Sequence, residues 1–304
     1  MSLKIAVVGA GYLGQHHARI YSELPETELV GVVDVDGERA KDVALRYGSR
    51  AYQDYREILS DADALSIVVP TTDHFDVALT CLRAGKDILV EKPIAATLPQ
   101  ADALIAEAEK MNCILQVGHL ERYNPGVIAL SRMIEEPGFI EAVRRSPFLN
   151  RCSDVDVTLD LMIHDIDIIL SLIPSPVKRT TAYGFSLVTE KIDEARVWME
   201  FENGTVASLT SSRISRERER TMKVFQKGSY LALDYQEGVV EIRSRKDPAN
   251  PEIVRPQYRE PLKEELKDFI HCVLHRERPR VSGDEGRNAL QMALEITSLA
   301  GGRS

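Results

Sequence analysis

The sequence lacks the features that mark exported, membrane-spanning and disulfide-stabilised proteins. Its four cysteines in 304 residues have neither the density of a disulfide scaffold nor the spacing of a metal site: Cys81, Cys113, Cys152 and Cys272. No apolar run is long enough to cross a bilayer, and the first apolar segment reaches glycines too soon for a signal peptide. We therefore expect reduced thiols, no bound metal, no membrane partner and a cytoplasmic location.

Positive charge is also scarce. Lysine and arginine total 38 against 47 aspartates and glutamates, which gives a formal net charge of -9. An acidic protein has no bulk electrostatic attraction for a phosphodiester backbone or for anionic lipid. The charge balance therefore argues against nucleic acid as a partner, and any anionic ligand must be held by local cations.

Apolar residues are plentiful enough for two hydrophobic cores. The chain exceeds the usual size of one core, and 44% of its residues are hydrophobic. From residue 4 to about 115, short β-branched runs alternate with amphipathic segments, which indicates βαβ units and a parallel sheet. Strand-like runs from 179 to 254, with hairpin breaks at 202–204, 227–228 and 236–238, indicate a mostly antiparallel sheet.

These patterns predict an α/β Rossmann domain followed by an α+β domain. The first, a parallel doubly wound sheet, should span residues 1–123 and bind NAD. The second, with a large and mostly antiparallel open sheet, should span 124–304 and serve substrate binding and oligomerisation. Its helical tail, from 261 to 300, is free to pack back on the first domain.

A glycine motif follows the first predicted strand and opens a helix. Gly9, Gly11 and Gly14, which enclose Tyr12 and Leu13, would allow a tight turn, close approach to a pyrophosphate and close helix packing. Alone, this pattern often means only a tight turn.

Asp34 adds specificity to the glycine motif. It ends the second strand, 20 residues beyond Gly14, where a carboxylate can bind ribose hydroxyls and repel a 2'-phosphate. The pair of features predicts NAD as the cofactor, with NADP disfavoured. The alternative for Asp34 is a helix cap or turn residue.

Two further strand ends carry candidate cofactor ligands. Pro70, Thr71 and His74 follow the fourth strand, and Glu91 and Lys92 follow the fifth, just before a proline. Ligands of open parallel sheets bind at the carboxyl ends of the strands, so we expect these residues near the cofactor. A capped helix start is the alternative for Thr71 and His74, and an exposed surface lysine is the alternative for Lys92.

One predicted helix, from Leu159 to Ile173, has an unusual polar stripe. At about 100° per residue, its polar side chains fall within a stripe only about 60° wide: Asp160, His164, Asp167 and Ser171. Apolar residues occupy most of the remaining circumference, interrupted by Asp165. Such a helix is largely buried, so its stripe should line a cleft or pair with buried partners.

The glycine motif, Glu91-Lys92-Pro93 and the Asp160-x-x-x-His164 helix resemble, in this order and spacing, the Gfo/Idh/MocA family of sugar and inositol dehydrogenases. The resemblance implies that Lys92, Asp160 and His164 are catalytic and that the Lys92-Pro93 bond is cis. A histidine that titrates near neutrality suits removal of the hydroxyl proton, so His164 is the preferred base. Lys92 would stabilise the developing negative charge and Asp160 would orient the sugar. A neutral Lys92 acting as the base remains the alternative.

The segments 118–125, 212–215 and 222–226 are similar to the UDP-N-acetylglucosamine 3-dehydrogenase branch of that family. This similarity implies oxidation of a UDP-sugar at C3, with a partner aminotransferase that consumes the keto product. The predicted substrate-binding residues are Lys92, Arg122, Tyr123, Asn124, Asp160, His164 and Arg213. Arg144, Arg145 and Arg151 are further candidates for a diphosphate, although each arginine could instead pair with a carboxylate.

Arginine and glutamate alternate over residues 216–220, so a strand would place the two charges on opposite faces. We expect an exposed or intersubunit sheet face there. The family resemblance implies a homodimer or tetramer formed through the second-domain sheet.

Two other functions are compatible with the sequence. A dehydrogenase of inositol, a free sugar or a sugar acid would carry the same motifs. A non-catalytic regulator that senses NAD and sugar would keep the glycines but would not need Lys92 and His164.

Overall fold

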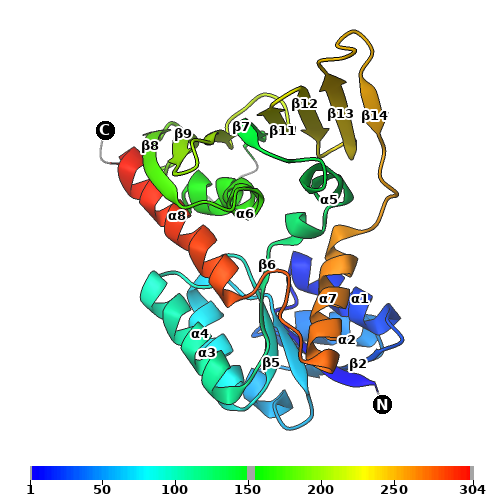
Figure 1. Ribbon diagram of the computed structural model, residues 1–304. Coiled ribbons are helices and arrows are strands. Elements are labelled where there is room, and N and C mark those ends of the chain that lie inside the picture. Colours follow the sequence, from blue (N-terminus) through cyan, green and yellow to red (C-terminus); the bar gives the residue numbers. More distant parts are fainter. Residues whose placement is uncertain (1, 149–154, 302–304) are drawn as a thin grey trace. The chain divides into compact units, whose positions relative to one another are not determined.

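The computed structural model describes residues 2–148 and 155–301, and the chain divides into two units (Figure 1). The first unit comprises Met1–Leu120 and Glu260–Arg287, and the second comprises Glu121–Arg259 and Asn288–Ser304. The expected second domain is therefore interrupted, because segment 260–287 belongs to the first unit. Arg151 and Cys152 lie outside the described residues.

The first unit contains a parallel six-stranded sheet with the order β3-β2-β1-β4-β5-β6. The order reverses between β1 and β4, and this reversal is the point at which doubly wound sheets bind their ligands. The strands are β1 (Leu3–Val8), β2 (Thr27–Val33), β3 (Arg50–Tyr52), β4 (Ala64–Ile67), β5 (Asp87–Glu91) and β6 (Leu115–Gly118).

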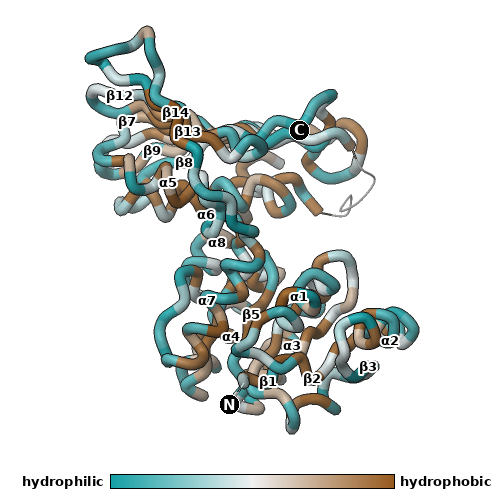
Figure 2. Tube along the Cα trace, turned by 90° about the vertical axis from the view of Figure 1, so that its right-hand side faces the viewer, coloured by the Kyte–Doolittle hydropathy of each residue, from teal (hydrophilic) through white to brown (hydrophobic). Residues whose placement is uncertain are grey.

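Helices cover this sheet. α1 packs on α2 and α7, and α3 packs on α4. Apolar side chains of α1, α2 and α7 join those of β1 and β2 in one buried cluster, and Figure 2 shows the hydrophobic colouring of these strands. The helices are α1 (Tyr12–Glu23), α2 (Gly37–Arg46), α3 (Thr71–Arg83), α4 (Leu98–Met111) and α7 (Pro261–His275), with a 3-10 turn η1 (Tyr55–Ile58).

The second unit contains an eight-stranded sheet with the order β14-β13-β12-β11-β7-β10-β9-β8. Among the described strands of this sheet, β7 and β10 are the one pair that is parallel, so the sheet is mostly antiparallel as predicted. The predicted hairpin breaks fall between β9 and β10, β11 and β12, and β12 and β13. The strands are β7 (Pro137–Arg145), β8 (Val177–Phe185), β9 (Glu194–Phe201), β10 (Val206–Ser212), β11 (Glu219–Gln226), β12 (Ser229–Asp234), β13 (Val239–Ser244) and β14 (Glu252–Val254).

Helices cover one face of this second sheet. Alternate strand residues such as Met222 and Val224 are fully buried in a cluster that also contains side chains of α5 (Pro125–Ser131), α6 (Ile163–Leu172) and the later part of α8 (Gly283–Gly301). Trp198 and Phe225, which alternate with buried residues, remain 45% and 42% exposed. The fold class predicted from the sequence is confirmed.

The predicted helix from 159 to 173 is not one regular α-helix. A π-helical turn, η3 (Thr158–Met162), precedes α6. A π turn is wider than an α-helical turn, so Asp160 does not follow the α-helical projection that relates it to His164. The polar stripe is also uneven, because Asp167 is buried whereas Ser171 is exposed.

A buried carboxylate holds the loop between β8 and β9. Asp193, with no exposed surface, accepts hydrogen bonds from the backbone N–H groups of Leu187, Val188 and Thr189 at 2.8, 2.6 and 2.9 Å. Arg213 donates through Nε at 2.9 Å. Burial opposes the negative charge, but the Thr189 and Val188 donors outweigh it and lower the pKa of Asp193 well below the ordinary range.

Replacing Asp193 with alanine should lower the free energy of unfolding by about 3–5 kcal/mol at neutral pH, because the buried Arg213 guanidinium loses its counter-charge. The folded-state pKa of Asp193 is lowered. Its contribution is therefore present above the unfolded-state value of about 4 and lost as pH falls towards the folded-state value.

Urea unfolding across pH measures both effects. The control is Glu194→Ala, whose partner Arg196 is 63% exposed; that change should cost less than about 1 kcal/mol. Equal losses in the two variants would contradict the role assigned to Asp193.

Candidate active site

The glycine turn between β1 and α1 is fixed by close backbone packing. Gly9 has φ of +102°, and a Cβ there would lie 2.2 Å from the Val68 carbonyl oxygen. A Cβ at Gly14 would lie 1.8 Å from the carbonyl oxygen of Gly9. Both positions therefore require glycine, one for its backbone conformation and both for space.

Gly11 differs, because a Cβ there would meet no heavy atom of the described residues within 4 Å. Gly11 is the N-cap of α1, and no side chain of the described residues caps that helix. The N–H groups of its first turn therefore remain available to a ligand, at the favourable end of the helix dipole. This arrangement fits the diphosphate of a dinucleotide. Tyr12, at the same helix start, is 79% exposed, and Leu13 packs on the core.

Asp34 lies beside the glycine turn. It is 8% exposed, and its carboxylate accepts hydrogen bonds from the N–H groups of Ala10 at 2.8 Å and Asp36 at 2.9 Å. Oδ1 accepts only the Asp36 N–H among the described residues and so retains capacity for a hydroxyl, whereas Oδ2 also accepts from Arg39 at 3.4 Å. The capping role considered for Asp34 belongs to Asp36, whose side chain accepts from the N–H groups of Glu38 and Arg39.

The start of α3 supports the structural alternative for His74. This side chain is 1% exposed, with Nδ1 2.8 Å from the Pro93 carbonyl oxygen and Nε2 2.9 Å from that of Val69. Burial lowers the pKa of the imidazole. His74 thus joins two loops at the sheet edge, while Pro70 is the N-cap and Thr71 the first residue of α3.

At the end of β5, the Lys92-Pro93 peptide bond is cis, as the family resemblance implies, and Lys92 is half-buried. Glu91 is only 6% exposed, and its Oε2 accepts from the Lys92 N–H at 3.3 Å. A Cβ at Gly118 would lie 2.8 Å from the Glu91 carboxylate. The Glu91 side chain therefore points into the protein. Its hydrogen bond to the Lys92 N–H helps to position the Lys92 backbone.

A buried polar chain, not recognised from the sequence, continues from Glu91. Its Oε1 lies 3.3 Å from His17 Nε2; His17 Nδ1 lies 3.2 Å from Ser66 Oγ, which is 2.7 Å from the Tyr21 hydroxyl. His17, Ser66 and Tyr21 have no exposed surface. Burial raises the pKa of the Tyr21 phenol, so its proton is retained. A lone histidine on the inner face of a helix gives no sequence signal of such a contact.

In the second unit, Asp160 on η3 and His164 on α6 are both half-buried. The next residue, Asp165, is 2% exposed and accepts two hydrogen bonds from Arg144, each 2.9 Å long. Arg144 also donates to Glu121 at 3.0 Å. Asp165, which interrupts the apolar side of the predicted helix, is thus paired with the buried Arg144.

The predicted substrate residues of this unit also have internal contacts. Arg122 donates to Asp167 at 3.3 Å, Tyr123 is 3% exposed, and the Asn124 side chain caps α5. Arg213 is 4% exposed and donates to the Val155 carbonyl as well as to Asp193.

Arg145, one of the further candidates for a diphosphate, pairs with Glu219 at 2.9 Å. These contacts support the structural alternative most strongly for Arg213. Substrate contact by the others stays a prediction.

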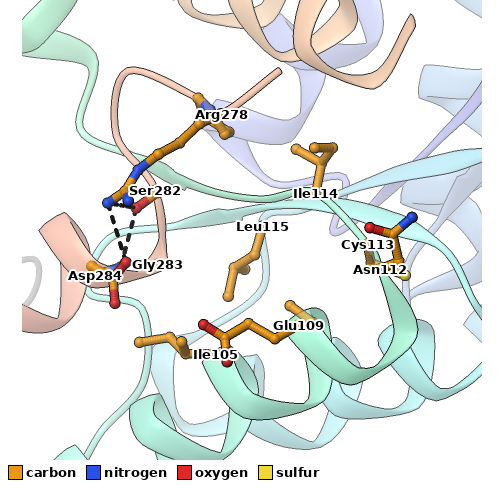
Figure 3. A pocket seen from close by; sticks show the side chains of 12 residues that line it. Ile105, Glu109, Asn112, Cys113, Ile114, Leu115, Arg278, Ser282, Gly283 and Asp284 are labelled. Carbon is orange, nitrogen blue, oxygen red and sulfur yellow. Dashed lines mark hydrogen bonds and ion pairs between the residues drawn. The ribbon is translucent and has the colours of Figure 1, made fainter. Parts of the chain in front are cut away.

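The first unit also has a surface pocket (Figure 3). It is lined by α4, β6 and the segment before α8, where Arg278 donates to Ser282 and Asp284. It contains none of the predicted site residues. In the described part of the chain, no helix is long and apolar enough to span a membrane.

Comparison with known proteins places the chain in a family. Residues 3–119 match the oxidoreductase family with an NAD-binding Rossmann fold, and residues 142–231 match the GFO/IDH/MocA C-terminal domain. The chain belongs to the Gfo/Idh/MocA family. It is therefore an NAD-dependent oxidoreductase, as the glycine turn and Asp34 indicate.

Relatives cover nearly the whole chain. UDP-N-acetylglucosamine 3-dehydrogenase of Acidithiobacillus ferrooxidans is 36% identical over 302 residues, covering 97% of this chain and 96% of that enzyme. Its solved structure has a TM-score of 0.94 and covers 99% of this chain and 98% of the other. Myo-inositol 2-dehydrogenase of Thermotoga maritima is 28% identical and covers 95% of this chain and 93% of that enzyme.

The His17 contact leads to a test of the first unit. Replacing His17 with leucine leaves the Glu91 carboxylate buried without its imidazole neighbour, which should lower the free energy of unfolding by about 1–3 kcal/mol. Dehydrogenase activity should also fall, because the same carboxylate accepts the Lys92 N–H. His271, a 54% exposed side chain on α7, offers the matched control His271→Leu, expected within about 0.5 kcal/mol. Urea unfolding compares the two, and equal stability would refute the contact's contribution.

Proposed function

We propose that this enzyme oxidises a secondary hydroxyl of a sugar with NAD, at C3 of UDP-N-acetylglucosamine, to give a 3-keto nucleotide sugar. The observation that carries the proposal is the likeness to a relative of that name, and the three residues predicted to be catalytic support it. Lys92 directly follows β5, and Asp160 and His164 lie on η3 and α6. The relative is 36% identical over 97% of the chain. Inositol oxidation is the second candidate, because an inositol dehydrogenase covers 95% of the chain at lower identity.

The chemistry divides between cofactor and protein. NAD, when bound, supplies the hydride acceptor, held by the glycine turn and the N-terminus of α1, with Asp34 at the ribose. His164 takes the hydroxyl proton as the hydride leaves carbon. The Lys92 ammonium stabilises the negative charge that develops on oxygen, and Asp160 orients the sugar. Lys92 as the base is the alternative, and it would require a neutral amine.

NAD is the proposed cofactor in preference to NADP. The Asp34 carboxylate lies beside the glycine turn, where it would repel a 2'-phosphate. The nearest cation on α2, Arg39, lies 3.4 Å from Asp34 and also pairs with Asp36. Its charge is thus engaged by carboxylates.

A homodimer or tetramer through the second-unit sheet is also proposed. The exposed face carries aromatic rings in contact: Phe139 lies 5.5 Å from Trp198 and 5.7 Å from Phe225, between ring centroids. Exposed apolar patches of this kind are typical of protein interfaces. The keto product would suit a partner aminotransferase, which condenses an amine with a carbonyl.

A substrate panel tests the proposed reaction. NADH formation at 340 nm is followed with UDP-N-acetylglucosamine, free N-acetylglucosamine, myo-inositol and glucuronate, each with NAD and with NADP. Turnover should be fastest with the nucleotide sugar and NAD. If a free polyol or sugar acid were oxidised and the nucleotide sugar were not, the substrate assignment would be wrong.

Removing either proposed catalytic group should abolish turnover and spare the cofactor site. Lys92→Ala and His164→Ala are each expected to lower kcat by at least about 100-fold, with NAD affinity nearly unchanged. Lys110→Ala and His271→Ala, at exposed positions on α4 and α7, are the matched controls. Activity retained in both catalytic variants would show the assignment to be wrong.

A further inference from the structure

Two arginines stand opposite one another on the helix-covered face of the second sheet. Arg220 of β11 pairs in register with Arg144 of β7. Met222 and Val224, the next residues on the same side of β11, are fully buried. Because side chains alternate along a strand, Arg220 points to that covered face. This corrects the expectation from the alternating charges of 216–220, since β11 begins only at Glu219.

The two guanidinium groups differ in their partners. Arg144 has Asp165 and Glu121 within hydrogen-bond distance. Arg220 is half-buried, its Nε is buried without a hydrogen-bond partner, and no carboxylate within the described ranges forms an ion pair with this side chain. Burial, together with the charge of Arg144, lowers the pKa of the Arg220 guanidinium. The described residues thus provide no acceptor for the Arg220 Nε–H.

A second donor lies close by without an acceptor. The Tyr235 N–H donates to the Arg220 carbonyl at 3.0 Å, and the Tyr235 ring centroid lies 5.2 Å from the Arg144 guanidinium carbon. The Tyr235 hydroxyl is buried beside the Arg144 guanidinium, which can only donate to it, and no described residue accepts the hydroxyl proton. An unpaired buried donor is costly, and more so when it is charged. An oxyanion is the kind of group that accepts from either donor.

This position adjoins the predicted substrate residues of the same unit. Arg144 binds Asp165, which follows His164 on α6, and Glu121, which precedes Arg122. Arg220 is therefore one side chain removed from both segments. Guanidinium groups bind phosphate and carboxylate oxygens through paired N–H donors.

We propose that Arg220 binds an anionic group of the substrate, a phosphate of the nucleotide diphosphate. The inference rests on the proposed function and identifies where an acidic chain supplies the cation for that group. A purely structural role is the competing explanation: Arg144 and Arg220 together would balance Glu121 and Asp165. That role predicts a loss of stability in Arg220 variants with substrate affinity unchanged.

The test measures ligand affinity and kinetics in full-length Arg220→Gln and Arg220→Lys, with Arg243→Gln as control. Arg243 is 45% exposed on β13 and pairs with Glu241. Calorimetry with the NAD-loaded protein gives the affinities of UDP, uridine and glucuronate, and initial rates give kcat and KM for UDP-N-acetylglucosamine. In Arg220→Gln we expect Kd for UDP and KM to rise about tenfold or more, with kcat within about threefold. Uridine affinity should not change.

The conservative variant keeps the proposal falsifiable if Arg220→Gln fails to fold. Lysine keeps the charge but loses the planar fork, so the preference for UDP over uridine should fall about threefold in Arg220→Lys. A folded Gln variant with unchanged Kd and KM, or an unchanged UDP preference in Arg220→Lys, would overturn the inference.

The failure of this inference differs from failure of the proposed function. If the wild-type protein oxidises the nucleotide sugar and the Arg220 variants have the wild-type Kd and KM, the proposed function stands and the proposed phosphate site is refuted. If the wild-type protein oxidises only a free sugar and does not bind UDP, both the proposed function and the proposed phosphate site are refuted. Glucuronate binding that depends on Arg220, without UDP binding, would assign the group to a sugar-acid carboxylate and refute the diphosphate.

Discussion

The second unit depends on the buried guanidinium of Arg144. This one side chain joins β7 to α6 through Asp165 and to the segment before α5 through Glu121. Removing one member of such a network costs about 3–5 kcal/mol, yet replacing all of it with well-packed apolar residues is often neutral or stabilising. The network is therefore better explained by position than by stability. It fixes the register of α6, which carries His164, against the sheet.

In the first unit, buried polar contacts also fix the segment that carries a proposed catalytic residue, Lys92, but fewer charged groups take part. The Glu91 carboxylate turns inward to His17, and the Lys92 N–H donates to it. His74 fixes the Pro93 carbonyl from another side. Lys92 thus leaves the end of β5 from a backbone held by two buried side chains. In both units, a half-buried group with proposed chemistry is adjacent to a buried polar contact that restricts it.

The sequence predicts features governed by local periodicity and fails where long-range pairing decides. Alternating strands and amphipathic helices identify the Rossmann unit, and turn residues locate three hairpins of the second sheet. β7 lies outside the predicted strands because its charged residues Glu141, Arg144 and Arg145 obscure the alternation, although its neighbours in the sheet are β10 and β11. The sequence allows the helical tail to pack back on the first domain, but it gives no signal that only 260–287 belong to that unit.

The candidate site shows the same division. The need for glycine at positions 9 and 14 could be predicted because it follows from backbone geometry close in sequence. The partners of Arg213, His74 and Asp165 could not, because each is a buried contact across distant segments. A pattern of charges does not say which cations are already neutralised. Only the structure distinguishes Arg144, which pairs with two carboxylates, from Arg220, which pairs with no carboxylate of the described residues.

This distinction bears on how an acidic protein can bind an anion. With a net charge of -9, the long-range field repels a nucleotide diphosphate, and screening confines any attraction to about 10 Å. A cation paired internally contributes little there, because its partner cancels the field. The useful cation is one that the fold leaves unpaired at some cost in stability, which is common at functional sites. Arg220 meets that condition because Arg144 takes both nearby carboxylates, so the network that fixes α6 also leaves the adjacent guanidinium available to a ligand.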